Sequence, residues 1–427
     1  MCRNYNRRYL LCFLFLFAGY SSFAQKSNRE NSPYTRFGIG EFRNGANVSL
    51  RGMASISSAY SSEYAVNTDN PASYANLRLT TYEAGVEGSK RTIYSGGNSY
   101  PTGTVTLSYL TIGIPVGKHF GMALGLRPYT RTYYNSSDSV NMPGLGPSIR
   151  GYNGDGSSNF AFLGFAGKVK GFSAGINFGY LFGNMSHAST LVKQYDTVNS
   201  FNSVFSKNTR IGGLYYKGGL MYETALNKKF GLRLGATFST SQSINAKLDE
   251  YQYIYNPYYS AGTQRDTAIK TEGAKGNIVL PSTYSFGAQL FSKDNWAVGL
   301  DFTTANWKEY RNFGSTDSVA DRTYRVAVGG EFTPNPTSLY KYLNRVTYRL
   351  GLYYGKDYIE LRNTQLDYYA VTLGASLPFK RTPDRFHFGM EIGKRGTQSN
   401  GLIRENFFKF MVGMSLNDRW FVKSKQY

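Results

Sequence analysis

The side chains that carry most catalytic chemistry are few and scattered in this sequence. The chain has three histidines, and the topology expected below places His119 in a short turn, His187 at the start of a long loop and His387 in a late strand. A hydrolase needs a nucleophile, a base and an orienting group in one place, and the sequence has neither a Gly-x-Ser-x-Gly elbow nor a His-Glu-x-x-His motif. We therefore predict that the protein is not an enzyme.

Metal and thiol chemistry also find little support in the sequence. Residues 153–156 (Asn-Gly-Asp-Gly) suggest a calcium loop but lack its later ligands, so we interpret them as a flexible turn. Both cysteines, Cys2 and Cys12, lie in the expected signal peptide. The mature chain would then have no disulfide, thiolate metal site or cysteine nucleophile, and we predict no metal and no cofactor.

Residues 1–24 have the three parts of a secretory signal peptide, which would be removed. The charged start, the apolar core and the small-x-small cleavage site are, in order, Arg3, Arg7 and Arg8, then residues 10–18, then residues 22–24 (Ser-Phe-Ala). Cys12 lies too early in the apolar core, and without preceding small residues, to be a lipoprotein cysteine. We expect export without a lipid anchor.

The composition favours a membrane barrel over a helical membrane protein. The 427 residues are 16% aromatic, include 47 glycines and have a mean hydropathy of -0.39. A membrane helix needs about 20 apolar residues in a row, and the only apolar run is residues 10–18. A transmembrane barrel alternates lipid-facing and lumen-facing residues, so its mean hydropathy stays low.

The formal charge is +21, and it falls to +18 when Arg3, Arg7 and Arg8 are removed. The basic residues are spread singly rather than clustered, which argues against nucleic-acid binding. Outer-membrane lipid and lipopolysaccharide phosphates are better partners for a basic exported barrel. A merely soluble basic surface explains the charge about equally well.

From residue 79 onward, apolar and polar residues alternate with a period of two, which is the signal of a β-strand with one apolar face. Residues 172–180 and 230–239 show this alternation most clearly. A soluble sandwich could show it too. About fourteen strands are expected, at residues 79–90, 102–114, 120–132, 158–169, 172–184, 208–224, 229–243, 281–292, 294–308, 321–333, 345–357, 366–379, 384–396 and 404–416.

Connection lengths separate a barrel from a sandwich. The connections after the second, fourth, sixth, eighth and twelfth strands are short, whereas residues 133–157, 185–207 and 244–280 form long ones, and residues 334–344 are a longer exception on the short side. Outer-membrane barrels have this arrangement of short periplasmic turns and long extracellular loops. Closure also removes the two edges that an open sheet would expose.

The sequence therefore predicts an all-β protein, a closed antiparallel transmembrane β-barrel with an N-terminal hatch in its lumen, located in the outer membrane. The signal peptide would cover residues 1–24, the hatch 25–78, the barrel 79–418 and a periplasmic tail 419–427. The hatch is expected because residues 44–60 are rich in small residues and show no strand period. Such a segment before the first strand most simply folds into the lumen.

Two stretches resemble the FadL-type transporters of long-chain fatty acids and aromatic hydrocarbons. Asn70, Pro71 and Ala72, directly before the first strand, resemble the Asn-Pro-Ala signature of that family's hatch. The same tripeptide also suits a simple turn. A later strand pair is similar as well, through the residues Pro281, Gly287, Trp296, Asp301 and Trp307.

The resemblance implies passive uptake of hydrophobic small molecules, with a hatch that gates the lumen and lateral release into the bilayer. The ligand-binding residues stay unknown. Arg233, Arg325 and Arg349 fall on lumen positions, where an arginine could bind a fatty-acid carboxylate or equally donate to the hatch backbone. FadL-type barrels also serve as accessory or shuttle subunits of secretion and assembly machines, including type IX secretion. The alternative function is therefore a barrel that binds protein partners through its long loops or its tail.

Overall fold

A computed structural model describes residues 30–143, 146–193, 202–255, 265–292, 295–380 and 382–420. The expected signal peptide and most of the expected C-terminal tail, residues 421–427, lie outside this part of the chain. Within it, no helix is both long and apolar enough to cross a membrane.

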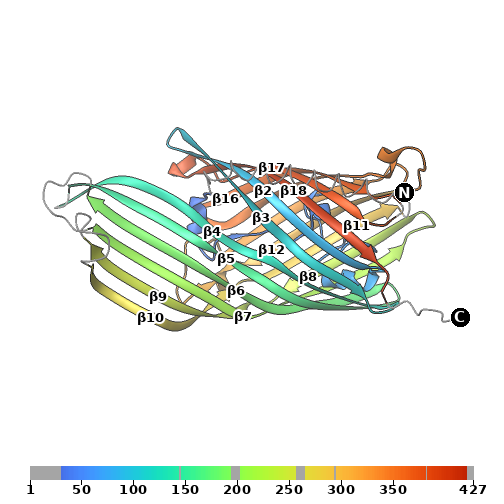
Figure 1. Cartoon of the computed structure of the whole chain (residues 1–427), viewed down its shortest axis with the longest axis horizontal. Helices are drawn as coiled ribbons and strands as arrows, with labels where there is room; N and C mark the ends of the chain where they lie inside the picture. Colours follow the sequence, from blue (N-terminus) through green and yellow to red (C-terminus); the bar gives the residue numbers. More distant parts are fainter. Residues whose placement is uncertain are drawn as a thin grey trace, which may run out of the picture.

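The wall is one antiparallel sheet that closes on itself, because β18 (Arg404–Asp418) pairs with β2 (Thr80–Ser95) along its whole length (Figure 1). Between them lie β3 (Asn98–Pro115), β4 (Phe120–Met142), β5 (Gly146–Val169), β6 (Phe172–Lys193), β7 (Asn202–Ala225), β8 (Phe230–Ser239), β9 (Gln242–Tyr255), β10 (Arg265–Leu280), β11 (Ser282–Ser292), β12 (Trp296–Asn306), β14 (Arg322–Phe332), β15 (Thr347–Leu361), β16 (Thr364–Pro378) and β17 (Arg385–Arg395). β8 and β9 are one interrupted wall strand, and β10 and β11 are another. The described wall therefore has the fourteen strands that the sequence predicts.

Side chains alternate between the two faces of the wall as expected. In β15, Arg349 and Tyr353 are buried toward the lumen, whereas Leu350 and Leu352 are more than half exposed on the outside. The same alternation places apolar residues on the outer face of β12, β14 and β16. This outer apolar surface is the one that lipid would cover.

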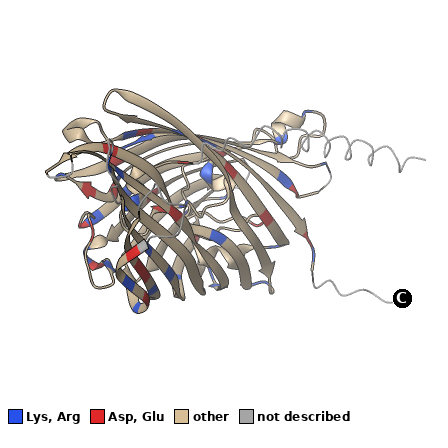
Figure 2. Ribbon diagram, turned by 60° about the vertical axis from the view of Figure 1, so that its left-hand side comes forward, with Lys and Arg blue, Asp and Glu red and all other residues tan. Residues whose placement is uncertain are grey.

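The expected long loops are largely strand, which corrects the sequence prediction. β4 continues to Met142 and β5 begins at Gly146, so residues 153–156 lie in β5, with Asn153 opposite Asn135, rather than in a flexible turn. β6 and β7 lengthen in the same way, and β9 with β10 occupies most of residues 244–280. These extensions carry many charged residues (Figure 2). Their polar and charged residues interrupt the alternation on which the sequence prediction relied.

The opposite end of the wall has short connections, at residues 116–119, 170–171 and 226–229. The expected turn at Lys293 lies partly outside the described residues. Residues 333–346, which connect β14 to β15, are longer and contain the 3-10 turn η5 (Tyr342–Arg345). The last strand, β18, ends at this end of the barrel (Figure 1).

Residues 30–79, called the plug below, pack inside the barrel. The plug contains η2 (Pro33–Arg36), β1 (Glu41–Phe42), α2 (Val48–Arg51) and η3 (Pro71–Asn76). Asn47 caps α2 by accepting a hydrogen bond from the Leu50 N–H (3.0 Å), which satisfies one of the free donors at the start of a helix. All four residues of α2 are buried; the side chains of Val48, Ser49 and Leu50 are small or apolar, and Arg51 forms ion pairs with the wall.

Candidate functional site within the barrel

Asn70, Pro71 and Ala72 lie at the contact between the plug and the wall. The Asn70 side chain accepts from the Ala72 N–H (3.1 Å) and caps η3, and its Nδ2 donates to the carbonyl oxygen of Leu220 in β7 (3.2 Å). A Cβ at Gly219 would lie 2.1 Å from Asn70 Oδ1, and one at Gly175 would lie 2.6 Å from the Pro71 carbonyl carbon. The tripeptide is thus a turn whose backbone fits against two wall glycines.

Gly287 and Asp301 face each other across β11 and β12 and receive a second plug turn. One Asp301 oxygen accepts from the Ser57 N–H (2.7 Å), the Ser58 N–H (2.9 Å) and the Ser58 hydroxyl (3.0 Å). A Cβ at Gly287 would come within 2.8 Å of Ser58 Cβ. The family-like strand pair therefore contains an acceptor and a small residue that together hold the plug.

The other three residues of that strand pair have different surroundings. Pro281 lies between β10 and β11, as expected for a residue whose backbone has no N–H to donate to the sheet. Trp296 begins β12 and packs against Phe230 at 5.7 Å between ring centroids. Trp307 follows β12 in η4 (Trp307–Glu309), where it is buried and stacks on Tyr358 at 4.3 Å.

Buried ion pairs tie the plug to the wall, and the sequence analysis missed them. Arg51 of α2 pairs with Glu87 in β2 and with Glu391 in β17. A second group surrounds Arg91, which pairs with Glu405 of the wall (2.7 Å) and with two plug carboxylates. Those two are Glu41 (2.8 Å) and Glu30 (3.2 Å). Charged residues at inward positions of otherwise alternating strands were the available signal.

Two of the lumen arginines donate to the plug backbone, which was one of the two expected alternatives. Arg325 donates to the Ala54 carbonyl (2.6 Å), and Arg233 donates to the Ser61 carbonyl (3.3 Å). Arg349 instead pairs with Glu331 of the neighbouring strand (2.8 Å). Arg325 and Arg233 thus hold the plug in place as charged donors, which make stronger hydrogen bonds than neutral ones.

Asp69, the residue before the tripeptide, lies between two cations of the wall. Its carboxylate is 3.1 Å from Arg127 and 3.8 Å from Lys217. Burial alone would raise the pKa of Asp69, but the charges of Lys217 and Arg127 outweigh this effect and hold the pKa below its ordinary value of 3.8. The plug therefore carries a fixed negative charge at this contact at neutral pH.

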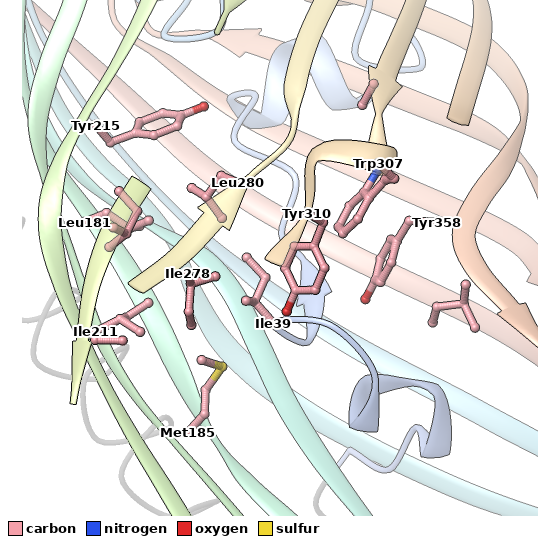
Figure 3. Close-up of a cluster of buried hydrophobic side chains, with 14 of the residues drawn as sticks. Ile39, Leu181, Met185, Ile211, Tyr215, Ile278, Leu280, Trp307, Tyr310 and Tyr358 are labelled. Carbon is pink, nitrogen blue, oxygen red and sulfur yellow. The ribbon is translucent and has the colours of Figure 1, made fainter. Parts of the chain in front are cut away.

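An apolar cluster of buried side chains packs the start of the plug against the wall. Tyr215, Leu181 and Ile278 project from the wall toward Ile39 of the plug, and Tyr310 with the Trp307–Tyr358 stack closes the cluster (Figure 3). Phe42 of the plug packs edge-on against Trp307 at 5.8 Å between ring centroids. The side chains of this apolar cluster pack against one another.

The wall is split between β3 and β4, and the start of the plug lies in the split. These strands pair only at residues 110–115 and 121–126, although both continue. Along the free part of β4, the Ser32 N–H donates to the Tyr133 carbonyl (3.0 Å), and β1 pairs with residues 130–131. On the β3 side, Arg43 donates to the Thr106 hydroxyl (2.9 Å).

A cavity of 240 Å³ lies at the short-turn end, between the plug and the wall. Tyr60 and Tyr64 line it from the plug, and Arg233, Arg349 and Arg385 line it from the wall. Burial raises the pKa of Tyr60 to about 12, so this phenol stays protonated. The cavity is polar and basic, unlike the apolar cluster.

The three histidines lie in different elements and have different neighbours. His119 precedes β4 in a short turn, His187 in β6 contacts the Tyr134 hydroxyl (2.9 Å), and His387 in β17 lies between two serine hydroxyls. Within the described residues, no group of three or more histidine, cysteine or acidic side chains has the arrangement of a metal site.

The structure resembles those of known hydrocarbon transport barrels. A Pseudomonas aeruginosa FadL homologue matches with a TM-score of 0.55 and 14% identity, covering 88% of this chain and 98% of that one. The Ralstonia pickettii toluene transporter TbuX matches with a TM-score of 0.57 and 12% identity, covering 88% and 99%. The Pseudomonas putida toluene transporter TodX matches with a TM-score of 0.54 and 14% identity, covering 89% and 99%. At these identities the likeness establishes the FadL fold of an outer-membrane barrel.

Sequence comparison assigns the chain to one protein family. No curated protein matches the chain in sequence. A family model described as BamG matches residues 6–426, which is nearly the whole sequence. The protein is a FadL-fold outer-membrane barrel, and it belongs to the BamG family.

Proposed function

We propose that this protein is an accessory barrel of an outer-membrane assembly complex, the BAM complex, and that it binds protein partners rather than conducting solutes. The observation that carries the proposal is the BamG family match over residues 6–426. The partners would be other proteins of that complex, and outer-membrane lipid and lipopolysaccharide would surround the wall.

The interior of the barrel supports this function. Both ion-pair groups and the contacts of Asn70 and Asp301 fix the plug to opposite sides of the wall. The apolar cluster packs the start of the plug against the wall, and residues 30–43 lie in the β3–β4 split. These contacts anchor the plug to several wall strands, which suits a supporting role in a complex.

Passive uptake of hydrophobic molecules, the function implied by the FadL resemblance, stays a prediction. It would require Asn70, Pro71 and Ala72 to act as a gating hatch signature, and Pro281, Gly287, Trp296, Asp301 and Trp307 to support the moving hatch. Their contacts agree as well with a permanently docked plug. The lateral route would also require residues 30–43 to leave the split.

Co-purification tests the proposed function. The full chain with an affinity tag is extracted from its native outer membrane in mild detergent, and the bound proteins are identified by mass spectrometry. We expect a stoichiometric complex with outer-membrane assembly proteins, and depletion of the chain should lower the amounts of other outer-membrane barrels. Recovery of the monomer alone, together with unchanged barrel levels on depletion, would refute the proposal.

A further inference from the structure

The connection at residues 333–346, called the 333–346 turn below, is longer than its position requires. It joins two adjacent antiparallel strands, β14 and β15, which a hairpin of two to five residues can connect. The connections at residues 170–171 and 226–229 on the same end of the barrel are of that short kind. The additional chain in the 333–346 turn therefore serves something other than closing the hairpin.

Hydrogen bonds hold the 333–346 turn in one conformation. The Asn335 N–H donates to the Asn344 carbonyl (2.8 Å), which closes the turn at its base. Tyr342 in η5 donates its hydroxyl to the Pro378 carbonyl at the end of β16 (3.1 Å), and Arg345 lies over the Tyr342 ring at 5.3 Å. The backbone is thus fixed before any partner binds, which lowers the entropy that binding would cost.

Large apolar side chains at the tip of this fixed turn face solvent. Tyr340 is 97% exposed, Leu339 is 88% exposed and Leu343 is 67% exposed. The charges of the turn are Lys341 and Arg345, and none of residues 333–346 is acidic. Exposed apolar residues grouped with a single sign of charge mark an interaction surface, and a tyrosine is a frequent anchor of protein interfaces.

The 333–346 turn is continuous with the basic cavity at the same end of the barrel. Thr333 and Thr347, which flank the turn, line the cavity, and their hydroxyls are 2.8 Å apart. Arg385, also in the lining, donates to the Thr347 hydroxyl (3.1 Å), and within the described residues no carboxylate pairs with it. Arg349 and Arg233 pair with Glu331 and Glu223, so Arg385 is the lining residue that adds positive charge beside the turn.

We propose that the 333–346 turn is the docking surface for an acidic face of a periplasmic protein. Leu339 and Tyr340 would enter an apolar recess of the partner, and Lys341 with Arg345 would meet carboxylates around that recess. This inference rests on the proposed function, because it supplies the contact through which an accessory barrel joins its complex. The short-turn end of an outer-membrane barrel faces the periplasm, and a rigid protruding tip beside a lumen-facing cavity favours a protein partner over lipid.

Paired variants of the full chain test the docking surface in the native membrane. Leu339→Ala with Tyr340→Ala removes the apolar tip, and Lys341→Glu reverses its charge. Matched controls are Leu226→Ala and Lys228→Glu in the 226–229 connection at the same end of the barrel, where Leu226 is 55% exposed. We expect each tip variant to reduce the co-purified partner about tenfold or more, since loss of a hot-spot contact has an effect of this size, whereas the controls retain it.

The outcomes separate this inference from the proposed function. If the unaltered chain recovers no assembly protein, the proposed function fails and the docking surface fails with it. If the unaltered chain recovers a complex and the tip variants recover it equally, only the docking surface is refuted. Each variant is first checked for a folded barrel by its heat-modifiable mobility on a gel, so loss of the partner cannot reflect loss of folding.

Crosslinking from the tip identifies what covers it. The chain's two cysteines are Cys2 and Cys12, so Tyr340→Cys provides the single reactive thiol of the described chain for a photoreactive label. We expect a crosslink to a polypeptide that is also present in the purified complex, at a peptide rich in aspartate and glutamate. Crosslinks to lipid alone would mean that the tip is a membrane anchor, and would overturn the proposal.

Discussion

At the scale of single residues, the plug is held by a few acceptors and by glycines that leave room for its backbone. Asp301 shows the first device, since one oxygen accepts three hydrogen bonds from Ser57 and Ser58. Gly175 and Gly219 show the second, because the turn at Asn70 and Pro71 occupies the space of a side chain. The same residues that resemble a transporter signature therefore have a defined structural task.

Replacing Asp301 tests the acceptor. Asp301→Ala should leave the buried donors of Ser58 and the Ser57 N–H without a partner, at about 1–3 kcal/mol for each donor. Asp301→Asn keeps one oxygen in place and should destabilise the plug less. Limited proteolysis of the detergent-solubilised protein measures this, with faster cleavage of the plug in the alanine variant. Equal cleavage rates in both variants would contradict the assignment.

Replacing Gly175 tests the close approach. A Cβ there would lie 2.6 Å from the Pro71 carbonyl carbon, so Gly175→Ala should destabilise plug docking by about 1–3 kcal/mol. Gly88 in β2 is the matched control, since its nearest contact would be 3.8 Å. We expect a lower thermal unfolding temperature in detergent for Gly175→Ala but not for Gly88→Ala. A similar decrease in both would indicate a general effect of losing a strand glycine.

The charge of Asp69 gives a pH dependence whose sign follows from its pKa. The pKa in the folded protein is lower than the ordinary value of 3.8, so the carboxylate stabilises the folded state above that value and loses its contribution as pH falls through the lower folded pKa. Plug protection against an acid-tolerant protease should thus be constant from neutral pH to about pH 5 and weaken below about pH 4. Asp69→Asn should reduce protection at neutral pH and flatten this dependence; an unchanged pH profile would contradict it.

At the scale of elements, the sequence predicts strands well where they cross the membrane and poorly elsewhere. The alternation in residues 172–180 exists because lipid covers one face of β6. β10 was missed because charged and exposed residues such as Asp266, Lys270 and Lys275 leave much of this strand without an apolar face. The plug could be placed in the lumen from its lack of period, but its partners in the wall, such as Glu391 for Arg51, required three-dimensional register.

The start of the plug acts as an element that completes the wall. Residues 30–43 lie in the β3–β4 split, and the small cavity left beside Glu30 and Arg131 measures 10 Å³, about enough for one water. Deleting residues 30–43 should therefore open a path through the wall. We expect higher single-channel conductance in planar bilayers than for a chain that begins at Glu30. Equal conductance of the two folded barrels would show that the split is closed without this segment.

At the scale of the whole molecule, the barrel shares its architecture with toluene transporters and packs an apolar cluster of its own side chains in its interior. The fold could be predicted from strand number, connection lengths and the irregular N-terminal segment. The apolar cluster could not be predicted, because Leu181, Tyr215 and Trp307 are far apart in sequence and come together only in the closed sheet. Architecture alone therefore leaves uptake and accessory functions unresolved, and the state of the lumen favours the second.

Uptake measurements on the intact protein decide between these functions. In liposomes, the full chain should admit toluene or a fluorescent fatty acid no faster than empty vesicles, because the apolar cluster occupies the lumen and residues 30–43 occupy the split. The toluene transporter TodX, reconstituted alongside, is the positive control for the assay. Uptake that matches TodX would instead establish a conduit. A barrel that stays closed yet is required for the assembly of other barrels acts through the proteins it binds.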